Sequence, residues 1–328
     1  TVNDGNGGNN YTVTTASNTT GTINQAALTI TAQTNTKTYD GTASALATPT
    51  IAGLQTGDSV TGAMEAYADK NAGSNKTLSV TGYTVNDGNG GNNYTVTTTP
   101  ISTGTINQAA LTITAQTNAK TYDGTASALA TPTYSGLQAG DSVTGLTEAY
   151  ANKNAGSNKT LSVTGYTVND GNGGNNYTVT TAPNTTGTIS PASLSITAQT
   201  NTKTYDGNTT ASAVPTITSG TLVGGDTAVL TETYDNQYLG TGKTLTPAAT
   251  INDGNGGNNY QITYIINTTG VITMGKDVIS ISTGDATRPI VISNEQGTTF
   301  ATVENKEKGG VLKTYETKKG DEGKRFCN

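Results

Sequence analysis

The sequence predicts an all-β protein made of a tandem array of small antiparallel β-sandwiches. The first reason is a repeat of 83 residues, which the motif TYDG marks at Tyr39, Tyr122 and Tyr205. The second is the alternation of apolar residues with threonine, whose period of two is typical of half-buried strands. The third is the supply of Asp-Gly, Asn-Gly and Gly-Gly steps between these stretches, because such steps tolerate the positive φ of tight turns.

The period divides the chain into three full repeats, residues 26–108, 109–191 and 192–274. A repeat of this size can hold its own core, although it is near the lower limit for a stable domain. Residues 1–25 match the C-terminal part of a repeat, so we expect this chain to be the C-terminal part of a longer array. Residues 275–328 contain nine of the 17 Lys and Arg residues. A terminal unit of different composition is expected to cap an array, and we predict four short strands in it.

Each repeat contains four clear strand patterns. In the first repeat these are ALTITAQ, TLSVTGYTV, NYTVTT and TGTIN, at residues 27–33, 77–85, 93–98 and 103–107. Gly82 interrupts the second pattern and predicts a β-bulge. The nearest approach to a helix is one turn within residues 63–73. A β-grasp-like domain with one short helix is therefore the alternative fold.

The third repeat departs from the period in its middle. Asp226 lies two residues later than Asp141 predicts, Tyr234 lies one residue late, and at Asn252 the register is restored. Compensated changes of this kind are typical of surface loops. Between repeats, residues 102–116 contain no flexible break. We therefore expect the last strand of one repeat to lead directly into the next repeat as a stiff connection.

Composition excludes most catalytic chemistry. The chain has no His and one Cys, so it can form no Ser-His or Cys-His pair and no His-containing zinc site. We therefore predict that it is not an enzyme and holds no cofactor. The formal net charge of −6 argues against a nucleic-acid partner. No apolar run approaches the roughly 18 residues that a transmembrane helix needs.

The motif NDGNGGNN places one carboxylate in each repeat, at Asp87, Asp170 and Asp253. Its Gly and Asn content predicts a long hairpin loop. A calcium site is the weaker alternative, because calcium takes six to eight oxygen ligands and usually several carboxylates. Each loop offers one carboxylate, so we predict no metal site.

Two further sets of residues are candidates for structure or function. In KTYDG, Tyr39 is predicted to anchor the edge of the core while Asp40 and Gly41 turn the chain. A lysine and an upstream glutamate also recur in every repeat. Exposed ion pairs are the first interpretation, and a Lys–Asn amide crosslink assisted by a buried acid is the alternative. The residues are Lys76, Lys159 and Lys243, with Glu65, Glu148 and Glu232.

Together these motifs resemble the YDG-domain family, an immunoglobulin-like repeat type of bacterial surface proteins. The resemblance rests on KTYDGT, GDSVT, AYADKNAGSNKTLSVTGYTV, NNYTV and STGTINQA, at residues 37–42, 57–61, 66–85, 92–96 and 102–109. It implies an immunoglobulin-like sandwich in each repeat. It also implies a large exported adhesin of a Gram-negative bacterium, similar to filamentous haemagglutinin and the high-molecular-weight adhesins, many of which use two-partner secretion. Such a protein is extracellular, at the cell surface or in a biofilm matrix, and its repeats act as a stalk.

The resemblance further implies an outer-membrane transporter or anchor, neighbouring adhesin chains, and host or matrix glycans as partners. Some two-partner adhesins are retained by a C-terminal Cys pair, but this chain has only Cys327. An anchoring role, a free thiol, a partner Cys beyond residue 328 and an intermolecular disulfide remain open for it. The high-molecular-weight adhesins can carry sugars at Asn-x-Ser/Thr, which makes nine residues candidates here: Asn10, Asn18, Asn75, Asn93, Asn158, Asn176, Asn184, Asn208 and Asn267.

Two alternatives to a stalk follow from the residues. Each repeat would bind glycan or mucin in the first, with Tyr67, Tyr150 and Tyr234 as the best aromatic candidates, although core packing suits them as well. In the second, chains associate into a matrix polymer through open strand edges or through Cys327.

Overall fold

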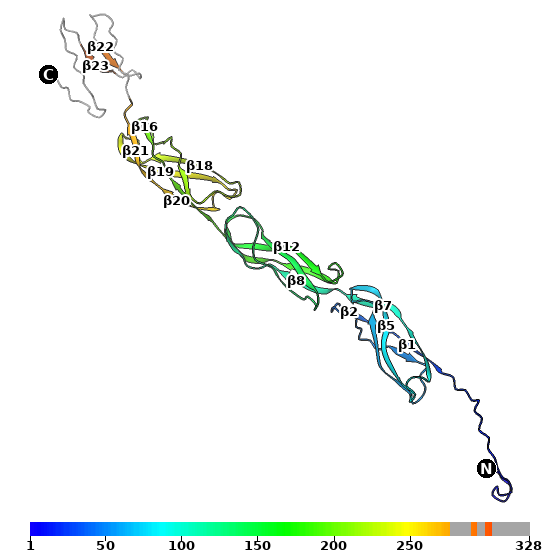
Figure 1. Ribbon diagram of the computed structural model, residues 1–328. Coiled ribbons are helices and arrows are strands. Elements are labelled where there is room, and N and C mark those ends of the chain that lie inside the picture. The colour runs from blue at the N-terminus through cyan, green and yellow to red at the C-terminus, as the bar shows by residue number, and fades with distance from the viewer. Residues whose placement is uncertain (276–289, 294–298, 304–328) are drawn as a thin grey trace. The chain divides into compact units, whose positions relative to one another are not determined.

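The computed structural model describes residues 1–275, 290–293 and 299–303. The chain separates into two compact units, Thr1–Pro191 and Ala192–Asn328. Every regular element in the described residues is a β-strand (Figure 1), so the prediction of tandem all-β domains is confirmed. Within the same ranges, no helix is long and apolar enough to cross a membrane.

The first repeat consists of seven strands in two sheets. One sheet has the strand order β3-β1-β6, and the other has the order β2-β7-β5-β4. The 25 residues before β1 contain no strand (Figure 1, dark blue). The strands are β1 (Ala26–Thr31), β2 (Thr36–Thr38), β3 (Thr50–Ala52), β4 (Ser59–Tyr67), β5 (Gly73–Asn86), β6 (Tyr94–Thr99) and β7 (Ile101–Asn107).

The second repeat has the same topology within the first compact unit. Its sheets have the orders β10-β8-β13 and β11-β12-β14-β9. The strands are β8 (Ala109–Thr114), β9 (Ala119–Thr121), β10 (Thr133–Ser135), β11 (Ser142–Tyr150), β12 (Gly156–Asn169), β13 (Tyr177–Ala182) and β14 (Asn184–Ser190).

The second compact unit contains the third repeat and two further strands. The repeat's sheets have the orders β17-β15-β20 and β16-β21-β19-β18. Of the four strands predicted after residue 275, two correspond to β22 and β23, which pair antiparallel, and the other two lie outside the described residues. The strands are β15 (Ala192–Thr197), β16 (Thr202–Thr204), β17 (Thr216–Ser219), β18 (Thr227–Tyr234), β19 (Gly240–Asn252), β20 (Tyr260–Ile265), β21 (Asn267–Thr273), β22 (Ile290–Ser293) and β23 (Thr299–Val303).

Alternate residues of the central strands form the core of each repeat. In the first repeat, Leu28 and Ile30 of β1, Leu78 of β5 and Ile106 of β7 are at most 1% exposed. Burying one such side chain contributes about 1.5–3 kcal/mol. The positions have close counterparts in the second repeat, namely Leu111, Ile113, Leu161 and Ile189.

Two strand pairs in each repeat are parallel, so the sheets are mixed and the predicted antiparallel pairing holds only for the remaining pairs. In the first repeat, β1 runs parallel to β6 over six residue pairs and β2 runs parallel to β7 over three. The other pairs are antiparallel. Alternation within a strand indicates which face is buried, but it carries no information on the direction of the neighbouring strand.

Residues 63–73 contain no helical turn, contrary to the sequence prediction. They include the end of β4, where Glu65 and Tyr67 are both buried and the residue between them is half-buried. A spacing of two between buried residues is that of a strand. Residues 1–275 contain no helix at all, so the β-grasp-like alternative does not hold.

A bulge lies on β5 where Gly82 predicts one, and β4 has a compensating extra residue opposite it. Thr61 pairs with Thr84 and Met64 pairs with Gly82, so β4 uses three residues where β5 uses two. Glu65 then pairs with Val80, so β5 uses two residues where β4 uses one. In the third repeat, β18 pairs with β19 without any shift, and each is one residue shorter than its counterpart. Part of the changed register of the third repeat therefore lies in paired strands, not only in loops as predicted. Removing one residue from each strand deletes the bulge and preserves the ladder.

Candidate functional site: the junction of the first two repeats

The NDGNGGNN loop is organised by its own carboxylate. Oδ1 of Asp87 accepts the backbone N–H groups of Asn89 and Gly91, both at 2.8 Å, and Oδ2 accepts that of Asn93 at 3.0 Å. The loops of Asp170 and Asp253 have the same three bonds, at 2.7–3.0 Å. Since three N–H donors already occupy each carboxylate, these loops make poor calcium cages. Across the described part of the chain, no group of three or more His, Cys, Asp or Glu side chains could hold a metal ion.

This loop is not the predicted hairpin, because β5 and β6 belong to different sheets. It carries the chain from one sheet to the other. Burial raises the pKa of Asp170, but the three N–H donors outweigh burial and hold the pKa below 3.8. The stability that this carboxylate contributes is therefore present above pH about 4 and is lost as the pH falls through the lowered pKa.

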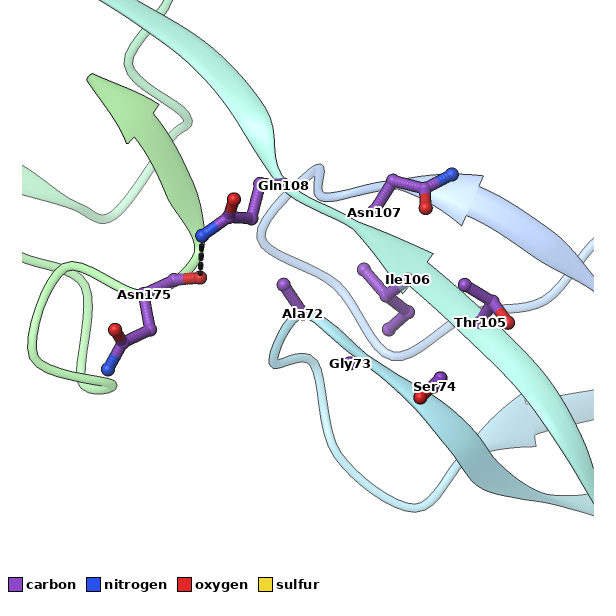
Figure 2. A pocket seen from close by; sticks show the side chains of 8 residues that line it. All are labelled: Ala72, Gly73, Ser74, Thr105, Ile106, Asn107, Gln108 and Asn175. Atoms are coloured by element: carbon purple, nitrogen blue, oxygen red, sulfur yellow. Dashed lines mark hydrogen bonds between the residues drawn. The ribbon is translucent and has the colours of Figure 1, made fainter.

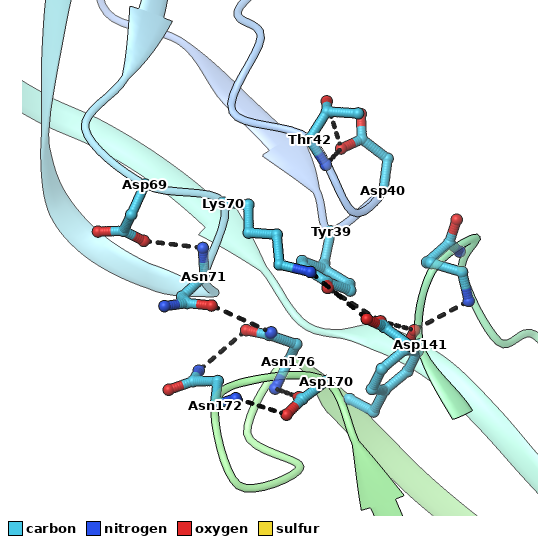
Figure 3. A network of polar contacts seen from close by, with 12 residues as sticks. Tyr39, Asp40, Thr42, Asp69, Lys70, Asn71, Asp141, Asp170, Asn172 and Asn176 are labelled. Atoms are coloured by element: carbon cyan, nitrogen blue, oxygen red, sulfur yellow. Dashed lines mark hydrogen bonds and ion pairs between the residues drawn. The ribbon is translucent and has the colours of Figure 1, made fainter. Parts of the chain in front are cut away.

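The loop of the second repeat packs against the end of the first repeat. Asp170 and Asn176 are 2% and 0% exposed, whereas Asn93, at the position of Asn176 in the first repeat, is exposed. Oδ1 of Asn176 accepts the backbone N–H of Ala72 at 2.8 Å. Its Nδ2 donates to Oδ1 of Asn71 at 3.3 Å (Figure 3). A single amide side chain therefore provides both a donor and an acceptor across the junction.

The Asp141 carboxylate joins the two repeats. Its side chain is 1% exposed and precedes β11. Oδ2 accepts the hydroxyl of Tyr177, from the same repeat, at 2.6 Å, and the hydroxyl of Tyr39, from the first repeat, at 2.9 Å. Oδ1 lies 3.4 Å from Nζ of Lys70 (Figure 3). Removing a carboxylate from water is costly, and these donors from both repeats offset that cost.

The aromatic rings complete this contact. Tyr39 and Tyr177 meet edge to face, with ring centroids 5.4 Å apart and an interplanar angle of 77°. Burial raises the pKa of both hydroxyls, and the Asp141 charge adds to this effect. Both tyrosines therefore stay protonated at neutral pH and donate to the carboxylate. The contact with the Tyr39 hydroxyl, aided by the Asp141 charge, raises the pKa of Lys70 and keeps it cationic.

The side chain of Gln108, which lies in the link between the first two repeats, bonds to the second repeat. Nε2 of Gln108 donates to the carbonyl oxygen of Asn175 at 2.9 Å, and its Oε1 accepts the hydroxyl of Thr178 at 3.0 Å. Gln108 is the only residue between β7 and β8, which confirms the prediction of a connection without a flexible break. An open pocket of 370 Å³ lies beside it (Figure 2). None of its eight lining residues is ionisable, so the pocket offers no acid–base group.

The first repeat has an equivalent N-terminal face, and among the described residues no other repeat packs on it. Tyr94 donates to Asp58 at 2.6 Å, as Tyr177 does to Asp141. Within the described residues, no second tyrosine donates to Asp58. Asp58 therefore provides a natural comparison, because it has the bond within the repeat but lacks the bonds between repeats.

The C-terminal end of the third repeat differs from that of the first. Where the first repeat has Lys70, Asn71 and Ala72, the third has the sequence Gln-Tyr-Leu at residues 237–239. Tyr238 and Leu239 are 68% and 42% exposed. This end of the third repeat therefore lacks an ammonium group at the position of Lys70 and an amide at the position of Asn71.

The recurring lysines do not pair with the recurring glutamates. Nζ of Lys76 lies 2.6 Å from Asp69, and Lys159 and Lys243 contact Asn152 and Asn236 in the same way. The glutamates are buried and reach the first sheet instead, where Glu65, Glu148 and Glu232 accept the N–H groups of Gln33, Gln116 and Gln199. The acid of the proposed Lys–Asn crosslink is therefore not placed at the lysine.

The other predicted site residues are placed as follows. Tyr67, Tyr150 and Tyr234 are at most 4% exposed and donate to polar groups inside each repeat, so they are not available to a glycan. Among the Asn-x-Ser/Thr candidates, Asn176 is fully buried and is not accessible to a modifying enzyme in the folded chain. Cys327 lies outside the described residues. Asn184 and Asn267 are half-buried, and the exposed candidates are Asn10, Asn18, Asn75, Asn93, Asn158 and Asn208.

Sequence reasoning did not assign the junction residues to a site. Tyr39 is predicted as a core anchor and is 1% exposed, but its hydroxyl partner lies 102 positions away. Asp141 lies in the recurring GDSVT motif, and its recurrence marks the position as structural without revealing a contact with another repeat. A pattern inside one repeat does not encode which surfaces of two repeats meet.

The strand topology and the junction together define the class of protein. It is a tandem array of β-sandwich repeats, and its first two repeats share a buried polar contact. Residues 24–101, 107–186 and 190–269 each match the family model of the YDG domain. Because the matches cover more than half of the chain, the protein belongs to the YDG-domain family. No curated protein and no solved structure matches the chain.

Replacing Asp141 with Asn removes the charge that holds Tyr39, Tyr177 and Lys70 together. Hydrogen bonds to charged groups are worth about 1.5–3 kcal/mol, so we expect the backbone amide of Ala72 to exchange roughly 10- to 100-fold faster. Hydrogen exchange measured by NMR on the full chain gives this rate. The matched control is Asp58→Asn, which should leave the Ala72 rate unchanged. An unchanged rate in Asp141→Asn would contradict the assignment of this junction.

Glu232 gives the third repeat a distinct dependence on pH. Its side chain is 1% exposed, and Oε1 has no hydrogen-bond partner among the described residues. Burial raises its pKa above 4.5 against the opposing effect of the Gln199 N–H. The protonated form is therefore favoured by folding. The stability it contributes is fully present below pH 4.5 and is lost as the pH rises through the raised pKa, at up to about 1.4 kcal/mol per pH unit.

We expect Glu232→Gln to remove this dependence. Relative to wild type, the variant should gain free energy of unfolding between pH 4.5 and 7, because the amide carries no charge at any pH. No histidine titrates in this pH range, because the chain contains none. Denaturant titration of the full chain, monitored by hydrogen exchange of the β19 amides, measures the free energy of unfolding of each protein. If the free energies of unfolding of the two proteins changed with pH in the same way, the carboxyl group would not titrate as proposed.

Proposed function

We propose that this chain is the structural stalk of a bacterial surface adhesin or biofilm-matrix fibre, located outside the cell. In this role its repeats project a distal adhesive region and catalyse no reaction. The observation that carries the proposal is the Asp141 junction, which buries a charge between repeats and satisfies it from both sides. A flexible string of binding domains has no need of such a contact, whereas a stalk must transmit force and direction from one repeat to the next.

The strand order within each repeat supports a load-bearing role. The chain enters the first repeat through β1 and β2 and leaves it through β7. Because β2 pairs with β7 in parallel, and β1 pairs with β6 in parallel, pulling the two ends apart loads these ladders in shear. In shear, the hydrogen bonds of a ladder resist together rather than opening one after another. The one-residue link at Gln108 adds no slack between the first two repeats.

The partners of such a stalk are part of the same proposal. They are an outer-membrane transporter or anchor, neighbouring adhesin chains, and the glycans that the distal region contacts. Export by the two-partner route and sugars on the exposed Asn-x-Ser/Thr residues also belong to it. A glycan site within the repeats gains no support, because its three candidate tyrosines are buried in the cores.

Deleting one whole repeat separates a stalk from a binding module. Removing residues 109–191 in the producing cell joins the first repeat to the third at an equivalent position. We expect a distal epitope to lie closer to the cell by the length of one repeat in immunoelectron microscopy. Adhesion measured in direct contact with the target should persist. An adhesion loss in proportion to the number of repeats would assign the binding function to the repeats themselves, and failure of antibodies to label intact cells would contradict the extracellular location.

A further inference from the structure

The third repeat differs from the others at the end of one edge strand. The strand β6 ends in Thr-Thr and is followed by Pro100, and β13 ends in Thr-Ala and is followed by Pro183. The equivalent strand of the third repeat, β20, ends in Tyr264 and Ile265 and is followed by Ile266. These three residues are 44%, 43% and 53% exposed. The substitution therefore exposes three consecutive large apolar side chains in a single repeat.

The backbone of β20 is open on one side. It is the last strand in the order β17-β15-β20 and pairs with β15 over six residues. The backbone N–H groups of Ala192 and Ala198 donate to the carbonyl oxygens of Asn259 and Ile265. These two bonds show which residues of β20 direct their backbone groups toward β15. Alternate residues of a strand direct their N–H and C=O groups to opposite sides. The backbone groups of Ile262 and Tyr264 therefore face away from β15, where no strand pairs with β20 among the described residues.

This edge lacks the devices that normally prevent strand pairing. Natural edge strands are protected by charges, prolines or bulges. The sequence of β20, YQITYI, contains no charge and no proline, and its ladder with β15 has no register shift. In the first two repeats, the proline that follows the strand removes an N–H donor and ends the edge. Ile266 restores that donor and lengthens the apolar stretch.

We propose that the β20 edge is a self-association site, at which the β20 strands of two copies of this chain pair antiparallel about a two-fold axis. The occupant follows from the chemistry of the edge. The unpaired N–H and C=O groups of an edge strand can pair with those of another edge strand. A two-fold axis places the identical strand of a second copy in that position. The strand is uncharged, so two copies do not repel each other there although each chain has a net charge of −6.

The contact is small, and this determines its strength. A pair of six-residue strands with three apolar side chains on each buries less than the roughly 1,200 Å² of a standard stable interface. The association should therefore be weak and reversible in dilute solution. It becomes substantial where many chains are held close together, because tethering raises the effective concentration. This inference does not depend on the stalk role, since the edge is a property of the third repeat alone.

Sedimentation equilibrium of the full chain between about 10 µM and 1 mM tests the proposal. A Cys327→Ser background removes disulfide-linked dimers. We expect a concentration-dependent monomer–dimer equilibrium. The combined variant Tyr264→Thr, Ile265→Ala, Ile266→Pro copies the sequence of the second repeat, which the same fold accommodates. It should weaken association at least tenfold.

The matched control removes exposed apolar surface elsewhere in the same repeat. The variant Tyr238→Asn, Leu239→Ala copies the first repeat and should leave association unchanged. Hydrogen exchange provides the second readout, since the amides of Ile262 and Tyr264 should become protected as the chain concentration rises. A chain that stays monomeric, as it would if residues 276–328 covered the edge, overturns the proposal. Equal weakening by the two variants, or dimers without protection of these amides, also overturns it.

Discussion

The structure of the first two repeats depends on one buried carboxylate. Asp141 is almost completely removed from water, and within its own repeat the only side-chain donor to it is Tyr177. A single hydrogen bond does not offset the desolvation of a charge. The Tyr39 hydroxyl and the Lys70 ammonium group of the preceding repeat supply the rest. The second repeat thus reaches its full set of contacts only when another repeat docks on its N-terminal face.

The loop NDGNGGNN of the second repeat supplies further contacts at this junction. Asp170 fixes the loop from within through three backbone N–H groups, and the fixed loop presents Asn176 to Asn71 and Ala72 of the first repeat. In the second repeat the loop is therefore a preformed docking element for the first repeat. Its rigidity means that little conformational entropy is lost when the repeats meet.

The sequence predicts the composition of each strand better than the arrangement of the strands. Alternation identifies Leu28 and Ile30 as core residues because burial on one face of a strand leaves a period of two. It does not reveal that β1 runs parallel to β6, because strand direction is decided by packing between distant segments. For the same reason Tyr39 is correctly predicted as a core anchor, while its bond to Asp141 is not. Comparing repeats within the chain supplies further information, since the change from Pro183 to Ile266 is visible in the sequence alone.

The most direct test of the account is the width of the distance distribution between the first two repeats. Ser79 and Ser162 are exposed at equivalent positions of β5 and β12, so spin labels on Ser79→Cys and Ser162→Cys in a Cys327→Ser background report on it. Double electron–electron resonance should give one narrow distribution, which Asp141→Asn broadens. A broad distribution in the chain with Asp141 intact, or a width that Asp141→Asn leaves unchanged, would contradict the claim that a shared carboxylate couples the repeats.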